Sequence, residues 1–209
     1  MRTEFDPDRL AARSFYKLLT AVVVPRPIAW VSTTSPSGVD NLAPHSFFTV
    51  SCVDPPIVQF TSVRRKDTLN NVESTGEFVI NLAPEPLFEH INLTSTDFPP
   101  DISEFDAAAV DREPSARVKP PRVAASPVTL ECRLHSTLCL GDSTVVFGRV
   151  LLAAINEDVL IDGHPAIDRL RPLARLGKDE WATIGEVRTI PRIRYRDLRS
   201  SHTDGPAPA

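Results

Sequence analysis

Short runs in which hydrophobic and polar residues alternate dominate the pattern of this chain. The clearest run covers residues 128–134, where every second residue is apolar. Because successive side chains of a strand point to opposite faces of a sheet, this spacing predicts a strand with one buried face. Further strand-like runs, most of them bounded by Pro, Gly, Asp or Ser, cover residues 28–34, 39–52, 57–63, 77–83, 144–155 and 159–161. The pattern therefore predicts a β-rich protein.

Helical spacing is confined to short segments. Over residues 8–19 apolar residues recur three and four positions apart, with Asp6 or Asp8 as the cap, which predicts a short N-terminal helix. Residues 66–72 predict a second short helix, ended by Gly76, because glycine readily adopts the left-handed conformation that closes helices. Short strands with helices only at the edges favour a closed or partly closed β-barrel. The expected fold class is mainly β with peripheral helices.

Two residues mark expected interruptions of the strands. Pro44 lies in the middle of run 39–52 and predicts an edge or a bulge, because proline cannot donate to a ladder. Gly148 predicts a bulge or sharp bend within run 144–155. Residues 84–121, rich in proline and acidic residues, are expected to form an excursion on the barrel surface. We expect a single domain over residues 1–195 and a disordered polar tail over residues 196–209.

Composition and charge narrow the class of partner. A net charge of −4 and a pI near 5.7 show no excess of positive charge that would attract nucleic acid or an anionic membrane surface. The longest apolar run, residues 18–24, is too short to span a bilayer, and the charged N-terminus does not resemble a signal peptide. The three cysteines form no C-x-x-C pair, which favours buried free thiols and no metal site. A cytoplasmic location is expected.

A basic cluster precedes the second predicted helix. Arg64, Lys66 and Thr68 lie where a strand leads into a helix N-terminus, whose free amides and dipole attract anions. With the Ser62 hydroxyl, these groups suit a phosphate. The alternative is a solvated basic turn in which Asp67 caps the helix.

Neutral hydrogen-bonding residues gather at the ends of two predicted strands. Ser32 and Thr33 end one strand, and His45 and Ser46 lie in the next. Such donors together suit the pyrimidine edge of a flavin, although each residue alone is more typical of a hairpin turn. Trp30 fits the core or a stack against a flavin ring. No G-x-G-x-x-G sequence is present, so a dinucleotide would be a transient substrate.

Several ordered motifs together resemble a known family. They are R-P-I-A-W-V-S-T (26–33), N-L-A-P-H-S-F-F (41–48), D-P-P (54–56), K-D-T-L-N-N (66–71), G-E-F-V-I-N-L (76–82) and P-L-A-R-L-G (172–177) with Trp181. The chain resembles the flavin reductase-like family of FMN-binding split barrels from about residue 16 to residue 191. Two departures from the family pattern, His45 and Lys178, lie near the expected pocket and leave substrate choice open.

The resemblance implies a split β-barrel homodimer that binds FMN near the subunit interface and uses a reduced nicotinamide nucleotide as hydride donor. Segment 90–104 and the region of Arg175 are expected to serve as lid and dimer contacts. No catalytic side chain and no metal ligand is expected. The expected cofactor-binding residues are Trp30, Ser32, Thr33, Ala43, Pro44, His45, Ser46, Thr61, Ser62, Arg64, Lys66, Asp67, Thr68 and Asn81.

The expected function is an FMN-binding oxidoreductase of the flavin reductase type. Electrons would pass from NAD(P)H through the flavin to another flavin, a metal, a small organic acceptor or a partner monooxygenase. One alternative is a flavin-binding electron carrier or storage protein without efficient NAD(P)H oxidation. Another is a barrel that has lost its cofactor and serves as an interaction module.

Overall fold

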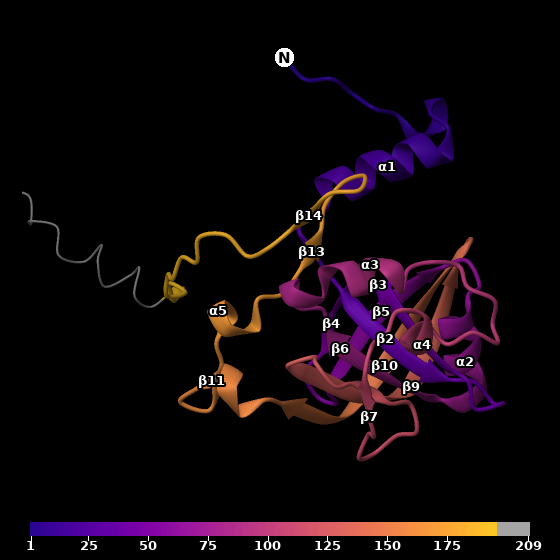
Figure 1. Ribbon diagram of the computed structural model, residues 1–209. Coiled ribbons are helices and arrows are strands. Elements are labelled where there is room, and N and C mark those ends of the chain that lie inside the picture. Colours follow the sequence, from indigo (N-terminus) through magenta and orange to yellow (C-terminus); the bar gives the residue numbers. More distant parts are fainter. Residues whose placement is uncertain (196–209) are drawn as a thin grey trace, which may run out of the picture.

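A seven-stranded antiparallel sheet forms the body of the protein (Figure 1). The computed structural model describes residues 1–195, so the predicted disordered tail lies outside the described residues. The strand order is β3-β2-β6-β9-β10-β5-β4. The strands are β2 (Ala29–Thr34), β3 (Asp40–His45), β4 (Phe48–Cys52), β5 (Ile57–Val63), β6 (Glu77–Leu82), β9 (Val128–Leu140) and β10 (Ser143–Ile155). The predicted mainly β fold is confirmed, and the single domain over residues 1–195 stays a prediction.

The two edge strands of this sheet follow each other in the sequence. The run 39–52 was expected to be one strand, but it divides into β3 and β4, which lie at opposite ends of the strand order. At the junction, the Thr61 amide of β5 donates to the Phe47 carbonyl at 2.9 Å. The sheet must therefore curl until its edges approach, as in a partly closed barrel. Pro44 lies on edge strand β3, as its missing N–H requires.

Strand β2 is buried on both faces and separates two apolar clusters. Its residues alternate between them: Ala29 and Val31 pack with Phe60 and Phe78, whereas Trp30 packs with Phe105. This alternation follows from the two-residue period of a strand. The sheet therefore has one core inside its curl and a second core beneath the segments that cover its outer face.

The helices lie around the sheet. Helix α2 (Asp67–Thr75) packs on the sheet through Leu69 and Val72 and ends at Gly76, whose φ of 74° is left-handed, as predicted. The N-terminal helix α1 begins later than expected, after a 3-10 turn. The remaining helical elements are η1 (Pro7–Arg9), α1 (Ala12–Val22), η2 (Glu85–Leu87), α3 (Phe88–Leu93), α4 (Glu104–Ala107), η3 (Glu157–Val159) and α5 (Ile167–Leu170).

The excursion 84–121 covers one face of the sheet. Ile91 of α3 and Phe105 of α4 are both fully buried in the second core, so the segment is an integral cover. Smaller sheets complete the fold. The two-stranded ones join β7 (Arg112–Glu113) to β8 (Arg122–Val123) and β11 (Leu160–Ile161) to β12 (His164–Pro165), and the three-stranded one has the order β1 (Arg26–Pro27), β13 (Ala174–Arg175), β14 (Trp181–Ala182).

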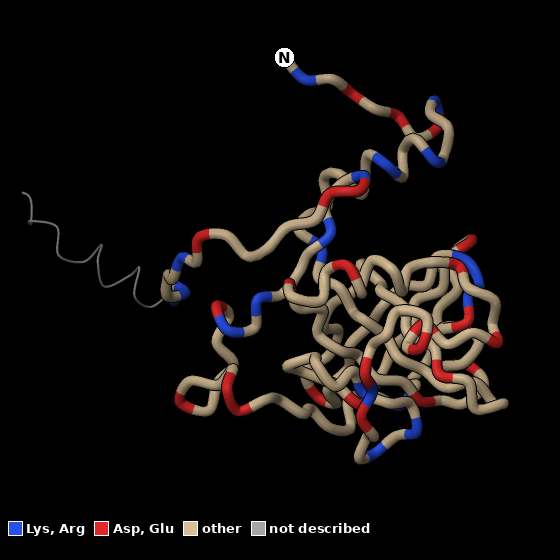
Figure 2. The backbone as a smooth tube through the Cα atoms, in the orientation of Figure 1, with Lys and Arg blue, Asp and Glu red and all other residues tan. Residues whose placement is uncertain are grey.

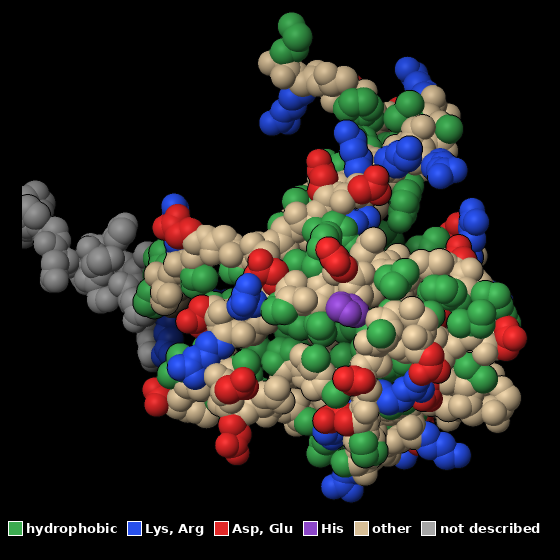
Figure 3. Space-filling model, in the orientation of Figure 1, with side chains coloured by type: hydrophobic (Ala, Val, Ile, Leu, Met, Phe, Trp, Pro, Cys, Tyr) green, Lys and Arg blue, Asp and Glu red, His purple; other side chains and the backbone are tan. Residues whose placement is uncertain are grey.

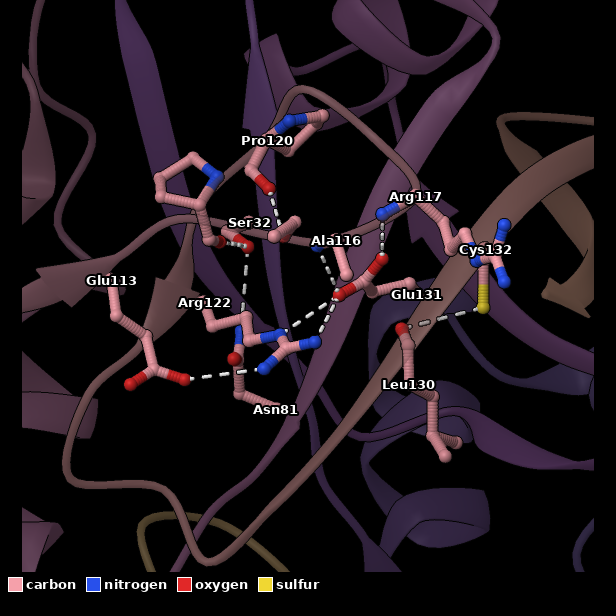
Figure 4. A network of polar contacts seen from close by, with 12 residues as sticks. Ser32, Asn81, Glu113, Ala116, Arg117, Pro120, Arg122, Leu130, Glu131 and Cys132 are labelled. Atoms are coloured by element: carbon pink, nitrogen blue, oxygen red, sulfur yellow. Dashed lines mark hydrogen bonds and ion pairs between the residues drawn. The ribbon is translucent and has the colours of Figure 1, made fainter. Parts of the chain in front are cut away.

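A buried carboxylate fixes the end of this excursion to the sheet (Figure 4). Glu131 of β9 has no exposed surface, although the strand pattern places it on the polar face. It accepts hydrogen bonds from the amides of Ala116 at 2.9 Å and Arg117 at 2.5 Å. The Arg122 guanidinium donates to it as well, at 2.8 Å from Nε and also from Nη2. These donors lower the pKa of Glu131 against the effect of burial.

Gly148 occupies the predicted bulge in β10, where the pairing register with β9 shifts. A Cβ at this position would lie 2.2 Å from Cζ of Phe78, whose buried ring packs edge-on against Phe60. The close approach of backbone and ring therefore requires glycine.

Replacing this glycine is expected to destabilise the fold. Gly148→Ala overpacks the core and should lower the free energy of unfolding by about 1–3 kcal/mol. Gly185→Ala is the matched control, because an added Cβ there has no heavy atom within 4 Å among the described residues. Denaturant unfolding of both variants measures the difference. Equal stability of the two variants would show that the Phe78 ring has room to move.

Helix α1 projects from the barrel (Figure 1). None of its residues is buried, and Leu19 and Val22 are exposed. Figure 3 shows apolar side chains along this projecting segment beside Lys and Arg, and Figure 2 shows both charge signs interspersed along the chain. No helix within residues 1–195 is long and apolar enough to cross a membrane.

Candidate functional site

A pocket of about 420 Å³ opens where β3, β5, the start of α2 and the loop after α3 meet. Its walls combine hydroxyls, amides, charged groups and a few aromatic rings. The lining residues are Tyr16, Asn41, Ala43, Pro44, His45, Ser46, Phe47, Thr61, Ser62, Val63, Arg65, Lys66, Asp67, Thr68, Asn70, Thr94, Ser95, Thr96, Asp97, Phe98 and Glu104.

The N-terminus of α2 forms one wall. Lys66 is the N-cap residue, and no side chain among the described residues caps the helix there. The alternative in which Asp67 caps the helix is therefore wrong, since Asp67 lies in the first turn. The first amides of a helix have no intrahelical acceptor, and the helix dipole adds positive potential. This wall can therefore bind an anion.

Both Lys and Arg side chains of the pocket lining are ion-paired. Lys66 Nζ lies 2.7 Å from Oδ1 of Asp97, an exposed carboxylate of the loop after α3. Arg65 is ion-paired with Glu73 at 2.5 Å and donates from Nε to Asn70 Oδ1 at 3.2 Å. Exposed pairs of this kind contribute about 0–1 kcal/mol, so a ligand can displace Asp97 at little cost.

His45 provides a neutral ring in the pocket. Burial lowers the pKa of His45 to about 4, so the imidazole is uncharged at neutral pH. Its ring packs at 4.7 Å from the Phe60 centroid, and its Nε2 atom is buried without a hydrogen-bond partner among residues 1–195. An unpaired buried polar atom costs about 1–3 kcal/mol. A ligand that hydrogen-bonds Nε2 would remove this cost.

Glu104 of α4 places a buried carboxyl in the same pocket. One of its oxygens, Oε2, accepts from the Leu42 amide of β3 at 2.9 Å. Burial raises the pKa of Glu104, and the charge of Asp67 raises it further, against the effect of the amides. Nearby, Asn41 Nδ2 donates to Thr68 Oγ1 at 3.0 Å, which joins β3 to the start of α2.

The structure brings together most of the predicted cofactor-binding residues. Their roles in binding stay predictions, but their convergence on one pocket is a finding. The residues that line the pocket are Ala43, Pro44, His45, Ser46, Thr61, Ser62, Lys66, Asp67 and Thr68.

Five predicted residues lie outside this pocket. Four of them are fully buried and hydrogen-bonded within the protein: Trp30, Ser32, Thr33 and Asn81. Trp30 donates to Thr94 Oγ1 at 2.9 Å, and Asn71 donates to Thr33 Oγ1 at 3.0 Å. Ser32 donates to the Pro121 carbonyl at 2.5 Å, and Asn81 Nδ2 donates to the Trp30 carbonyl at 2.9 Å. The fifth, Arg64, is exposed and lies at a φ of 64°.

The five residues therefore do not line this pocket, and their roles in cofactor binding stay predictions. On one face of β2, the excursion 84–121 accepts hydrogen bonds from Trp30 and Ser32. On the other face, Asn71 of α2 donates to Thr33. The sequence shows the alternation of β2, but it does not show that residues of the excursion 84–121, far along the chain, cover this strand. Arg64 lies in a left-handed turn before α2 and outside the pocket lining. Its neighbours Arg65 and Lys66 do line the pocket.

Sequence reasoning also missed part of the wall. Residues 94–98 and Glu104 come from the excursion, where only the family resemblance marked segment 90–104 as a lid. Tyr16 of α1 and Phe47 also line the pocket, with ring centroids 6.3 Å apart. No hydrophobic pattern separates such residues from ordinary surface positions.

The chemistry of the pocket fits a phosphorylated flavin. The start of α2 and Lys66 suit a phosphate, and the Nε2 atom of His45, which has no partner within residues 1–195, offers a hydrogen bond to a polar ring edge. The aromatic and apolar residues Phe47 and Pro44 supply surface for a ring.

Comparison with known proteins identifies the family. The flavin reductase like domain matches residues 21–170. An uncharacterised protein of Aquifex aeolicus is 40% identical over 171 residues, which cover 78% of this chain and 87% of that protein. Nitrilotriacetate monooxygenase component B from Bacillus cereus has a TM-score of 0.89 at 30% identity, covering 91% of this chain and 99% of that one. The 2-nitrobenzoate 2-nitroreductase NbaA of Pseudomonas fluorescens has a TM-score of 0.86 at 28% identity, covering 92% and 98%.

This chain belongs to the flavin reductase-like domain family. The family resemblance drawn from the motifs is thereby confirmed, as is the split-barrel fold.

Proposed function

We propose that the protein is an FMN-binding oxidoreductase of the flavin reductase type, which accepts electrons from NAD(P)H and passes them to a flavin, metal or small organic acceptor. One observation carries the proposal: a helix start without a side-chain cap, at Lys66, lines the same pocket as a neutral histidine whose Nε2 atom has no hydrogen-bond partner among residues 1–195. This pairing of an anion site with a polar and aromatic wall matches the two ends of FMN. The similar proteins from Bacillus cereus and Pseudomonas fluorescens, a monooxygenase component and a nitroreductase, support redox chemistry.

In this proposal the chain's own residues bind and orient the cofactor. The amides of the first turn of α2 and the Lys66 ammonium hold the phosphate after Asp97 releases Lys66. His45 donates or accepts one hydrogen bond at a ring edge, according to its tautomer, and Ser46 and Thr61 line the adjacent wall. When bound, FMN supplies the capacity to accept a hydride and to pass electrons on. The protein mainly aligns the donor with the ring, so no acid or base side chain is assigned to the chemistry.

A homodimer is part of the proposal. Helix α1 has no buried residue and carries exposed Leu19 and Val22, while its Tyr16 lines the pocket. An apolar face that begins beside the site suits a second copy of the chain, consistent with an interface near the cofactor. Light scattering tests this directly, because a dimer has twice the chain mass of 23.0 kDa. The cytoplasmic location also stays a prediction.

Two measurements on the purified protein test the function. We expect the protein to bind FMN, with a flavin absorbance spectrum, and to oxidise NADH or NADPH in a flavin-dependent reaction. Binding of FMN without oxidation of either nucleotide would favour the electron carrier or storage protein instead. A protein that binds no FMN and oxidises neither nucleotide would contradict both functions and leave an interaction module.

A further inference from the structure

The charges of the pocket do not balance for a phosphate dianion. Asp67, Asp97 and Glu104 line it together with the cations Arg65 and Lys66. Arg65 is paired with Glu73 outside the pocket lining, and Lys66 is paired with Asp97. A bound dianion would therefore meet uncompensated carboxylates, which would weaken its binding by like-charge repulsion.

The three carboxylates differ in how they can relieve this repulsion. The Asp97 side chain is 87% exposed and can turn into solvent, which also releases Lys66. Asp67 lies in the first turn of α2, where the helix dipole stabilises a negative charge. Glu104 is buried, and the Leu42 amide holds its Oε2 atom. Because the Glu104 side chain cannot turn out of the pocket, only protonation can remove its charge.

The surroundings of Glu104 favour its neutral form. From β3, the buried His45 is neutral at pH 7 because its pKa is about 4. From α2, the charge of Asp67 raises the pKa of Glu104 in addition to the effect of burial. Beyond α4, Arg112 of β7 is already paired with Asp40 at 2.8 Å and with Asp106.

We propose that Glu104 takes up a proton from solvent when a phosphorylated flavin binds, so that the affinity of the site for FMN depends on pH through this residue. The inference rests on the proposed function. The Nε2 atom of His45 in the same pocket is buried without a partner in the described part of the chain, which independently indicates that a ligand belongs there. The neutral carboxyl also becomes a hydrogen-bond donor for the ligand, in place of a repelling charge.

The variant Glu104→Gln isolates this effect, because its amide oxygen can still accept from Leu42 and it carries no charge. The wild type should bind FMN more weakly as pH rises above the pKa of free Glu104, by up to tenfold per unit. The affinity of Glu104→Gln for FMN should approach that of the wild type as pH falls, and at pH 8 the variant should bind FMN about tenfold or more tightly than the wild type. The phosphate of FMN itself titrates near pH 6, but this contribution is common to both proteins and cancels in the ratio of their affinities.

A second carboxylate variant and a second ligand serve as controls. The Lys66 ammonium lowers the pKa of Asp97, which is therefore ionised over this range. Asp97→Asn should strengthen FMN binding by a similar factor at every pH and retain the pH dependence of the wild type. Riboflavin, which has no phosphate, should bind wild type and Glu104→Gln with a ratio that changes little with pH.

Calorimetry keeps the inference testable without any variant. Titration of wild-type protein with FMN at pH 7, in buffers of different ionisation enthalpy, should show net proton uptake. FMN binding without proton uptake, or an affinity ratio between Glu104→Gln and wild type that is the same at pH 5 and pH 8, would overturn this inference and leave the proposed function standing. A wild-type protein that binds no FMN at any pH would overturn both.

Discussion

Lys66→Glu is expected to weaken FMN binding by more than tenfold while the fold survives. A charge-assisted hydrogen bond contributes about 1.5–3 kcal/mol, and 1.4 kcal/mol corresponds to a factor of ten in affinity. The variant removes this bond and places a carboxylate beside the phosphate. Lys66 is half-exposed, and its ion pair in the described part of the chain is with the exposed Asp97, so we expect the fold to survive its replacement. Fluorescence titration of FMN measures the affinity.

Arg64→Glu is the matched control for this prediction. It reverses the same charge in the same turn, but Arg64 lies outside the pocket. Both variants change the net charge by the same amount, so a difference between them reports the position of the side chain relative to the phosphate. Riboflavin should bind wild type and Lys66→Glu with similar affinity, because it has no phosphate. If Arg64→Glu weakened FMN binding as much as Lys66→Glu, the phosphate would not lie at the start of α2.

Glu131→Ala is expected to produce the largest loss of stability. Removing one partner of a buried ion pair typically costs about 3–5 kcal/mol. The variant leaves the Arg122 guanidinium and the amides of Ala116 and Arg117 without their acceptor (Figure 4). Glu113→Ala is the matched control, because Glu113 pairs with the same arginine at 3.4 Å but is half-exposed. Its loss should change the stability by about 0–1 kcal/mol.

The stability difference should also depend on pH. The pKa of Glu131 is lower in the folded protein than its ordinary value of 4.5. Its ionisation therefore stabilises the fold above that value, and the contribution is lost as pH falls through the folded pKa. Denaturant unfolding should show a constant advantage of wild type over Glu131→Ala above pH 5 and a shrinking one below pH 4.5. A pH-independent difference would show that packing, not the charge, makes Glu131 important.

The sequence predicted the elements better than their environment. Alternation, Gly76 and Gly148 located strands, a helix end and a bulge, because each has a local physical cause. The length of β9 was missed: its last residues, 135–140, are exposed and are held by pairing with β10, not by burial. The covering of β2 by residues far along the chain was equally invisible, and it removed Trp30 and Asn81 from the pocket.

The part of the candidate site whose residues are close together in the sequence could be predicted. The segment from Thr61 to Thr68 forms a strand and the helix start that follows it, so its geometry is local and could be read from the chain. The acidic part of the wall, Asp97 and Glu104, comes from the excursion and meets α2 only through tertiary packing. The charge conflict behind the proposed proton uptake therefore emerges only from the structure.

A crystal structure with FMN bound tests the central claim most directly. We expect the phosphate to lie within hydrogen-bond distance of the first amides of α2 and of Lys66 Nζ, and an edge of the flavin ring to lie at Nε2 of His45. Density for FMN away from the start of α2, or a ring in contact with neither His45 nor Pro44, would contradict it.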